Sequence, residues 1–193
     1  MRRFLVAFAA AATVAAAPAH ATDPNVLLGV APSTQLFGMS SLTGDFTLLN
    51  TLTDGVFLPE QTGWQSGTVW WQTPDPNFLA IEFDLGGSFV LSAFKAQLDN
   101  NDNYRLEYFD GTWHSLANQF PALFGFGMMT RDIVLAPGSE IVASKLRLFP
   151  VDGDNAYAAS EVQAFGVPVP EPGTYLMMLA GIGLLGFMMR RRI

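Results

Sequence analysis

Short runs of alternating apolar and polar side chains, separated by turn-forming residues, constrain the fold of this chain most strongly. In residues 79–85, LAIEFDL, the odd-numbered side chains are apolar, whereas Glu82 and Asp84 occupy even positions. The same alternation occurs in residues 104–109 and 145–149. Successive side chains of a strand point to opposite faces, so each run predicts a strand with one buried face. Such runs, with turns about every ten residues, predict an all-β protein built as an antiparallel β-sandwich or jelly roll.

The connections between these runs carry glycine, proline, asparagine and aspartate, the residues that favour turns. The segment DNNDN, residues 99–103, has oxygens at the first, third and fifth positions, as a calcium-binding hand loop does. Tyr104 replaces the glycine of that loop and Asp110 its glutamate, so we expect a tight hairpin loop instead. The other predicted turns are Asp54-Gly55, Gly86-Gly87, Asp110-Gly111, Pro137-Gly138 and Asp152-Gly153.

Residues 1–21 have the order of parts of a secretory signal peptide. Arg2 and Arg3 precede an apolar run from Phe4 to Ala17, and residues 19–21, Ala-His-Ala, form a small-x-small cleavage pattern. We expect removal after residue 21, which leaves a β-sandwich ectodomain over residues 22–166. Residues 22–45 form either an edge strand or a loose leader.

The chain ends in a proline-rich stretch, an uncharged apolar stretch and three arginines. Prolines fix φ and remove backbone donors, so residues 167–173 are expected to form an extended stalk. Residues 174–189 carry no charge and no polar face, which predicts one transmembrane helix. The positive-inside rule keeps the arginines cytoplasmic. The residues of this terminal pattern are Pro170, Glu171, Pro172, Arg190, Arg191 and Arg192.

A secretory signal combined with this terminus resembles the PEP-CTERM sorting signal of Gram-negative bacteria that make extracellular polysaccharide. The resemblance covers about the last 24 residues and assigns residues 167–193 to sorting. It implies that the secretory machinery exports the protein, that its tail holds it briefly in the inner membrane, and that an exosortase then cuts near Glu171. The product would reach the cell surface or the extracellular matrix.

Once both ends are removed, the remaining piece is strongly acidic. All 17 acidic side chains lie between Asp23 and Glu171, together with only five Lys and Arg, which gives a net charge of −12. Such a charge excludes a nucleic-acid partner, because phosphates require a basic surface. The chain has no cysteine, so an exported form is held together by packing or by a metal rather than by disulfides.

The order of strands and turns over residues 45–166 resembles the galactose-binding-like jelly roll of discoidin domains and many carbohydrate-binding modules. The best matches are IEFDLGG, residues 81–87, and ASEVQAFG, residues 159–166. The resemblance implies a structural calcium, with an aspartate of a DG turn and a glutamate of the last strand as ligands. Val56 departs from the pattern, which often has Asn or Asp there. The implied ligands are the carboxylates of Asp54 and Glu161, the carbonyls of Thr51 and Ser160, and the Thr68 hydroxyl.

A sugar site needs a flat apolar ring and a few polar groups for the hydroxyls. Trp64, Trp70, Trp71 and Trp113 offer rings, although Trp70 and Trp71 must point to opposite sides of a strand, so at least one of them fills the core. We select as candidate ligand residues Trp71, Asn100, Asn101, Asn103, Arg105, Trp113 and His114.

Catalytic machinery is not evident in the sequence. His114 is the only histidine after signal removal, and no nucleophile elbow lies near it. We therefore expect a non-catalytic surface protein that is associated with exopolysaccharide and whose sandwich binds carbohydrate. The alternative is a purely structural component of the matrix or biofilm that binds no small ligand.

Overall fold

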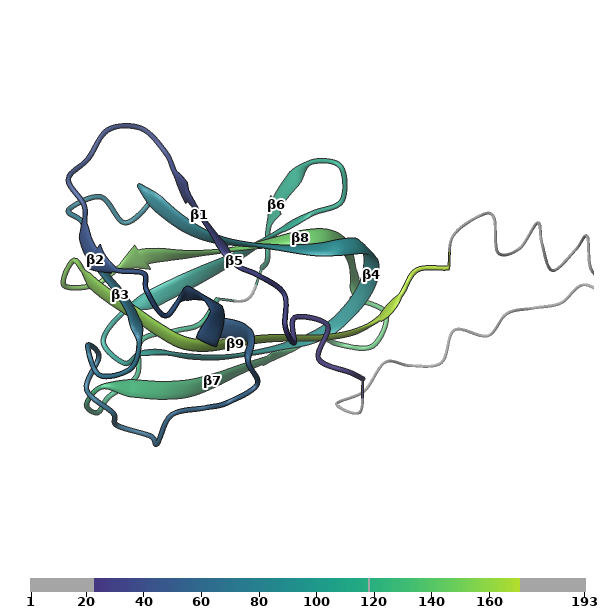
Figure 1. The fold of residues 1–193 in the computed structure, drawn as a ribbon. Coiled ribbons are helices and arrows are strands. Elements are labelled where there is room, and N and C mark those ends of the chain that lie inside the picture. Colours follow the sequence, from purple (N-terminus) through teal and green to yellow (C-terminus); the bar gives the residue numbers. More distant parts are fainter. Residues whose placement is uncertain (1–22, 118, 171–193) are drawn as a thin grey trace, which may run out of the picture.

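The computed structural model describes residues 23–117 and 119–170, and these form an antiparallel sheet folded into two layers (Figure 1). This confirms the predicted all-β fold. Five residues of 3₁₀ helix, η1, join β2 to the β3 segment. The elements are β1 (Ser33–Leu36), β2 (Thr43–Asp45), η1 (Leu49–Thr53), β3 (Val69–Gln72), β4 (Leu79–Asp99), β5 (Asn103–Phe109), β6 (Trp113–Ser115), β7 (Met128–Val134), β8 (Ile141–Asp152) and β9 (Ala156–Pro168).

The 21-residue strand β4 belongs to both layers. Its first part pairs with β1 and β8, and its last part pairs with β7 and β9. The predicted turn at Gly86-Gly87 is a bend inside this strand, which corrects the sequence prediction. Gly86 has φ +69°, and the register against β8 shifts between Asp84 and Phe89. The positive φ redirects the strand from one layer to the other without reversing it, as Figure 1 shows at the right.

Several predicted turns connect the two layers instead of forming hairpins. Asp110-Gly111 does join paired strands, since Phe109 pairs with Trp113. Residues 99–103 connect β4 to β5, which pair with other strands but not with each other within the described residues. The predicted hairpin is therefore wrong, although the loop is tight. The turn at Asp152-Gly153 likewise links β8 and β9, which β4 separates.

The core lies between the two layers and follows the predicted alternation. Ile81 and Phe83 on β4 are fully buried, and their cross-strand partners on β8, Leu148 and Leu146, are buried beside them. Trp71 on β3 is also fully buried, with its ring centroid 5.9 Å from that of Tyr157 on β9. Trp70 is only partly buried and lies edge-on to Trp64 at 5.5 Å.

Both ends of the described chain lie at the same end of the sandwich, which we call the tail end (Figure 1). Asp23 accepts a hydrogen bond from the Ser92 hydroxyl at 2.9 Å. At the other terminus, Pro168 still pairs with Phe89, and Val169 N donates to Ser88 O at 2.8 Å. The predicted stalk over 167–173 therefore begins inside β9. Residues 22–45 are not a loose leader where they are described, because β1 pairs with β4 and β2 with β3.

The opposite end, which we call the loop end, carries the β4–β5 loop, the segment before β7 and the turn before β9. Strand β9 runs from one end to the other, and its 13 residues separate the two ends by roughly 40 Å at about 3.3 Å per residue. Within residues 23–117 and 119–170, no helix is long and apolar enough to cross a membrane. The predicted signal peptide (1–21), transmembrane helix (174–189), Glu171, Pro172 and Arg190–Arg192 all lie outside the described residues.

Candidate ligand and metal sites

Two of the predicted asparagines hold the loops of the loop end together. Asn100 Nδ2 donates to the carbonyls of Leu123 at 3.3 Å and Gly125 at 2.9 Å. The Asn103 carbonyl oxygen accepts from Ala122 N at 2.6 Å, and its amide nitrogen donates to Asp152. These amides are therefore largely occupied by backbone and side-chain partners. They fix the segment before β7 against the β4–β5 loop.

This arrangement leaves a hollow of about 330 Å³ beside an exposed aromatic ring. The ring belongs to Phe124, whose side chain is fully exposed, and Asn101 is the exposed amide of the lining. Sequence reasoning missed Phe124 because LFGFG, residues 123–127, does not alternate and carries no pattern that marks this aromatic residue as exposed. We call this site the Phe124 hollow, and its lining is Asn100, Asn101, Ala122, Leu123, Phe124 and Gly125.

A buried carboxyl group lies beneath the same end of the sandwich. Asp102 is fully buried, and it accepts only long hydrogen bonds, from Asp154 N at 3.3 Å and from the Tyr104 hydroxyl at 3.4 Å. The Arg131 guanidinium is nearby but donates to the backbone carbonyls of Asp99 and Asp102, not to a carboxylate. Burial, reinforced by the negative charges of Asp99 and Asp154, raises the pKa of Asp102 to about 7.

Trp71 is part of the core, which corrects its assignment to a ligand site. Its ring is fully buried between Phe46 and Tyr157, so it cannot stack on a ligand. The indole nitrogen of Trp71 and the hydroxyl of Tyr157 are buried without a hydrogen-bond partner in the described part of the chain. Each unpaired buried donor costs about 1–3 kcal/mol in the folded state.

Two of the other predicted ligand residues, Trp113 and His114, lie away from the asparagines. Trp113 and His114 sit on β6, which pairs with the end of β5 at Phe109, roughly 20 Å along the strand from Asn103. His114 Nε2 lies 3.0 Å from Asp110 Oδ1 and 2.8 Å from the Thr112 hydroxyl. The structure therefore does not unite the predicted ligand residues in one site.

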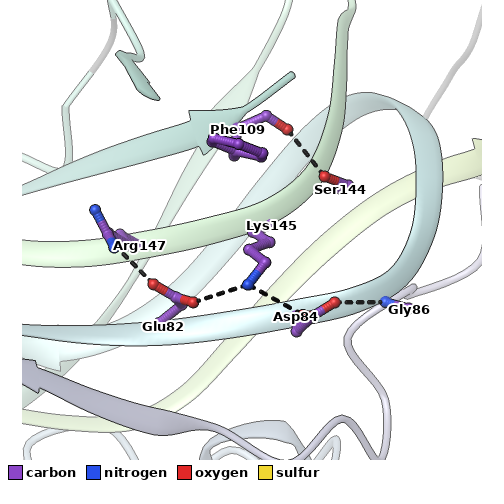
Figure 2. A network of polar contacts seen from close by, with 7 residues as sticks. All are labelled: Glu82, Asp84, Gly86, Phe109, Ser144, Lys145 and Arg147. Carbon is purple, nitrogen blue, oxygen red and sulfur yellow. Dashed lines mark hydrogen bonds and ion pairs between the residues drawn. The ribbon is translucent and has the colours of Figure 1, made fainter. Parts of the chain in front are cut away.

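The outer face of the layer formed by β4, β8 and β5 is a network of paired charges. Figure 2 shows Lys145 between Glu82 and Asp84, and Arg147 against Glu82. Arg147 Nε lies 2.8 Å from Glu82 Oε2. The Arg147 guanidinium also covers the Trp113 ring at 3.7 Å, so one face of this tryptophan is not free for a sugar. Arg105 pairs with Glu107 at 3.0 Å and lies over the ring of Phe149.

The predicted calcium ligands meet in part where η1 covers β9. Glu161 Oε1 accepts hydrogen bonds from Gly55 N at 3.1 Å and from Gln163 Nε2 at 3.0 Å. Glu161 Oε2 is buried and has no partner among the described residues. Burial raises the pKa of Glu161 to about 7, and the charge of the nearby Asp54 adds to the effect. Glu161 Oε2 is thus a buried carboxylate oxygen that accepts no hydrogen bond from the described residues, and the Asp54 carboxylate is close to it. Hard cations such as calcium bind to oxygens of this kind.

The other three predicted calcium ligands are in Thr51, Thr68 and Ser160. The Thr68 hydroxyl, one of the predicted ligands, donates to Trp64 O. The predicted ligand of Ser160 is its carbonyl; the hydroxyl of this residue donates to Gln97 Oε1 at 2.6 Å. The Thr51 carbonyl accepts a long bond, 3.4 Å, from Asp54 N and remains able to bind a cation. No cluster of three or more His, Asp or Glu side chains with metal-site geometry occurs in residues 23–117 and 119–170.

Comparison with known proteins gives separate matches for the C-terminal segment and for the β-sandwich. The family model described as the PEP-CTERM protein-sorting motif matches residues 168–192, which confirms the predicted sorting signal. A search of the curated proteins gives no match.

The solved structures similar to this chain include carbohydrate-binding domains, as the jelly-roll resemblance predicted. A Streptococcus pneumoniae fucose binding module is 15% identical, with a TM-score of 0.50; the match covers 76% of this chain and 97% of the module. The lectin domain of lectinolysin, solved with Lewis B antigen, is 14% identical, with a TM-score of 0.51 and coverages of 74% and 96%. SpGH29 is 18% identical at a TM-score of 0.46; the match covers 76% of this chain but only 28% of SpGH29. At these identities the likeness to the fucose binding module and to the lectin domain establishes the fold alone.

Proposed function

We propose that this protein is exported, processed by an exosortase, and displayed at the cell surface or in an exopolysaccharide matrix, where its sandwich binds carbohydrate without catalysis. The sorting motif over residues 168–192 supports the export and processing. The fold shared with a fucose binding module and a lectin domain supports the proposal that the sandwich binds carbohydrate.

The observation that carries the proposal is the exposed ring of Phe124 beside a hollow with an exposed amide, that of Asn101. A sugar ring stacks on an aromatic face, and its hydroxyls need hydrogen-bonding groups such as the Asn101 amide. The site lies at the loop end, roughly 40 Å from the sorting segment, so a tethered protein would present it outward.

A second hollow, of about 370 Å³, lies near Leu135 and Ile141 and is a weaker candidate. Its lining is mainly hydrocarbon, and its polar side-chain groups are the hydroxyls of Ser115, Ser139 and Tyr108. No lining residue offers an exposed aromatic face comparable to Phe124. We therefore place the carbohydrate at the loop end.

A glycan array, with the producer's own polysaccharide included, tests this proposal. The exported protein should bind at least one glycan, and Phe124→Ala should weaken that binding by about tenfold, since loss of a stacking ring costs about 1–2 kcal/mol. Leu28→Ala is the matched control, because Leu28 is another exposed apolar residue, remote from the loop end. Binding to no glycan and to no polysaccharide would favour the purely structural matrix component.

We also propose that a structural calcium occupies the site at Glu161, with Asp54 and the Thr51 carbonyl as further ligands. Calcium would stabilise the charged form of Glu161 and fix η1 on β9. The melting temperature should rise in millimolar calcium and should not rise in Glu161→Gln, because a ligand that binds only the folded state stabilises it. If millimolar calcium left the melting temperature of the wild type unchanged, the proposed calcium site would be wrong.

Processing is tested by the mass of the surface form. Cleavage after residue 21 and near Glu171 should produce a protein of about 150 residues that lacks the terminal arginines. An intact mass that still includes residues 174–193 would contradict exosortase processing.

A further inference from the structure

The β4–β5 loop holds the segment that carries the Phe124 ring. Asn100 Nδ2 donates to the carbonyls of Leu123 and Gly125, which flank the aromatic residue. Leu123 N donates to Asn100 O at 2.6 Å, and Asn100 N donates to Gly127 O at 3.1 Å. The Phe124 side chain is fully exposed and buries no surface that would anchor it. The position of this ring in the proposed site therefore depends on Asn100.

On its other side, the same loop places Asp102 inside the sandwich. This residue is fully buried, and its carboxyl group accepts two long hydrogen bonds, from Asp154 N at 3.3 Å and from the Tyr104 hydroxyl at 3.4 Å. Arg131 Nη1 donates to the backbone carbonyl of Asp102 at 3.0 Å. Strand β5, strand β7 and the turn before β9 therefore all contact the loop at this one residue.

The backbone of Gly153 closes one side of the Asp102 carboxyl group. A Cβ at Gly153 would lie 1.6 Å from Asp102 Oδ1 and 2.6 Å from Cγ. An ionised carboxylate requires short, charge-assisted hydrogen bonds of about 2.7–2.9 Å from protein donors or from water. Because the two existing bonds are longer and Gly153 blocks this side, an ionised Asp102 gains such bonds when the loop moves.

Charged and titratable groups face Asp102 from the elements packed against it. In residues 23–117 and 119–170, Arg131 is the only cation near this carboxyl, and its guanidinium donates to backbone carbonyls instead of to a carboxylate. Burial, reinforced by the negative charges of Asp99 and Asp154, raises the pKa of Asp102 to about 7, so the group changes its charge near neutral pH. The facing groups are Asp99 of β4, Tyr104 of β5, Arg131 of β7, Asp154 of the turn before β9 and Tyr157 of β9; Asp152 of β8 is exposed and bonds to Asn103.

We infer that Asp102 is a positioning residue for the Phe124 hollow: neutral Asp102 holds the β4–β5 loop in place, and ionised Asp102 loosens it. Asp102 lies two residues from Asn100, so a movement of the loop toward solvent also moves the amide that binds Leu123 and Gly125. The proposed glycan site is then best formed in weakly acidic solution and is loosened in alkaline solution. The inference rests on the proposed function, in that Phe124 contacts the glycan, and adds its dependence on pH.

Hydrogen–deuterium exchange of the exported protein tests this positioning without a glycan. The ratio of the exchange rate of the wild type to that of Asp102→Asn, for the amides of residues 122–127, should increase about tenfold from about pH 6 to about pH 8. A pKa of about 7 in the closed loop, against an ordinary 3.8 when the loop opens, makes opening easier by about that factor over this range. Comparison of the two proteins at the same pH removes the intrinsic effect of pH on exchange. An unchanged ratio would overturn the inference.

Two further variants identify the group and the contact that are responsible. Asp75→Asn is the matched control, because Asp75 is an exposed acid of the loop end whose Oδ1 accepts from Asn77 N at 2.9 Å, and asparagine retains that oxygen. It should follow the wild type at both pH values. Asn100→Ala should exchange fast at both pH values, because the contact between the loop and the Phe124 segment is then broken. Loss of the pH effect in Asp75→Asn to the same extent as in Asp102→Asn would mean that net charge controls this end, and would also overturn the inference.

Titration with the producer's own polysaccharide separates this inference from the proposed function. The wild type should bind the polysaccharide more weakly at about pH 8 than at about pH 6, by up to about tenfold, whereas Asp102→Asn should bind it equally at both. Binding that depends on Phe124 but is the same in the wild type at both pH values would overturn the inference and leave carbohydrate binding intact. Absence of binding, together with pH-dependent exchange of residues 122–127, would contradict the proposed function and support the positioning role of Asp102.

Discussion

Replacement of Asp102 by asparagine should stabilise this protein at neutral and alkaline pH. The carboxyl has a pKa of about 7 in the fold, against an ordinary value of 3.8, because it is buried among like charges. A raised pKa means that the folded state binds the proton more tightly than the unfolded chain does. The favourable contribution of the neutral acid is therefore complete below about pH 4 and is lost as the pH rises through about 7.

The size of the effect follows from these pKa values. Each pH unit between them changes the free energy of unfolding by about 1.4 kcal/mol, so the wild type should lose about 3 kcal/mol between about pH 5 and pH 8 through this group. For a domain of about 150 residues, that corresponds to roughly 6–12 °C in melting temperature. Asparagine keeps an oxygen for Asp154 N and offers a donor to the Tyr104 hydroxyl, so Asp102→Asn should lack this loss.

Denaturant unfolding followed by tryptophan fluorescence, at about pH 5 and pH 8, measures both proteins. Glu161 also titrates near neutrality but is present in both, so the difference between wild type and Asp102→Asn isolates Asp102. Asp132→Asn, at an exposed ion pair, is the control and should follow the wild type within about 0.5 kcal/mol. If Asp102→Asn were less stable than the wild type by the same amount at both pH values, the carboxylate would be ionised and satisfied, and the reasoning would be refuted.

Four substitutions distinguish residues that stabilise the fold from a residue of the proposed site. Gly153→Ala should cost about 2 kcal/mol or more in unfolding free energy, because its Cβ would lie 1.6 Å from Asp102 Oδ1 at a φ of +144°; an unchanged melting temperature would refute that clash. Trp71→Ala should cost about 3–5 kcal/mol as a cavity in the core, whereas Phe124→Ala should stay within about 0.5 kcal/mol, and urea titration compares them. Gln97→Ala should make residues 55–60 more sensitive to protease, because Gln97 bonds both to Leu58 N and to Leu58 O at 2.9 Å; equal cleavage rates would contradict this.

The strands could be predicted from the sequence because burial imposes a period of two on their side chains. Residues 79–85, 104–109 and 145–149 all lie in strands, and Trp71, one of two adjacent tryptophans, fills the core. The pairing partners were not predictable, since a turn residue does not reveal whether the next strand returns in the same layer. Gly86 illustrates this, because a positive φ is needed both for a reversal and for the bend that it forms.

The candidate sites were less predictable, for a related reason. Asn100 and Asn103 were selected for amides that could face a ligand, but the fold uses those amides to hold neighbouring loops. Phe124 carries no sequence pattern that distinguishes it from a core aromatic residue. Its exposure depends on contacts with the β4–β5 loop, some 20 positions earlier in the chain. Residue type indicated the chemistry, and only the long-range contacts decided which groups remain free.

The boundary between fold and sorting tail also follows from backbone chemistry. Pro168 ends β9 opposite Phe89 and has no N–H to donate, while the next residue, Val169, donates to Ser88. Because it lies at the end of the strand, this proline removes one backbone donor from the ladder without interrupting the pairing of β9 with β4. The N-terminal segment runs beside the same strand, since Val26 N donates to Ala164 O. All of these contacts precede Glu171, so a cut near that residue would leave every described strand paired and the loop end unchanged.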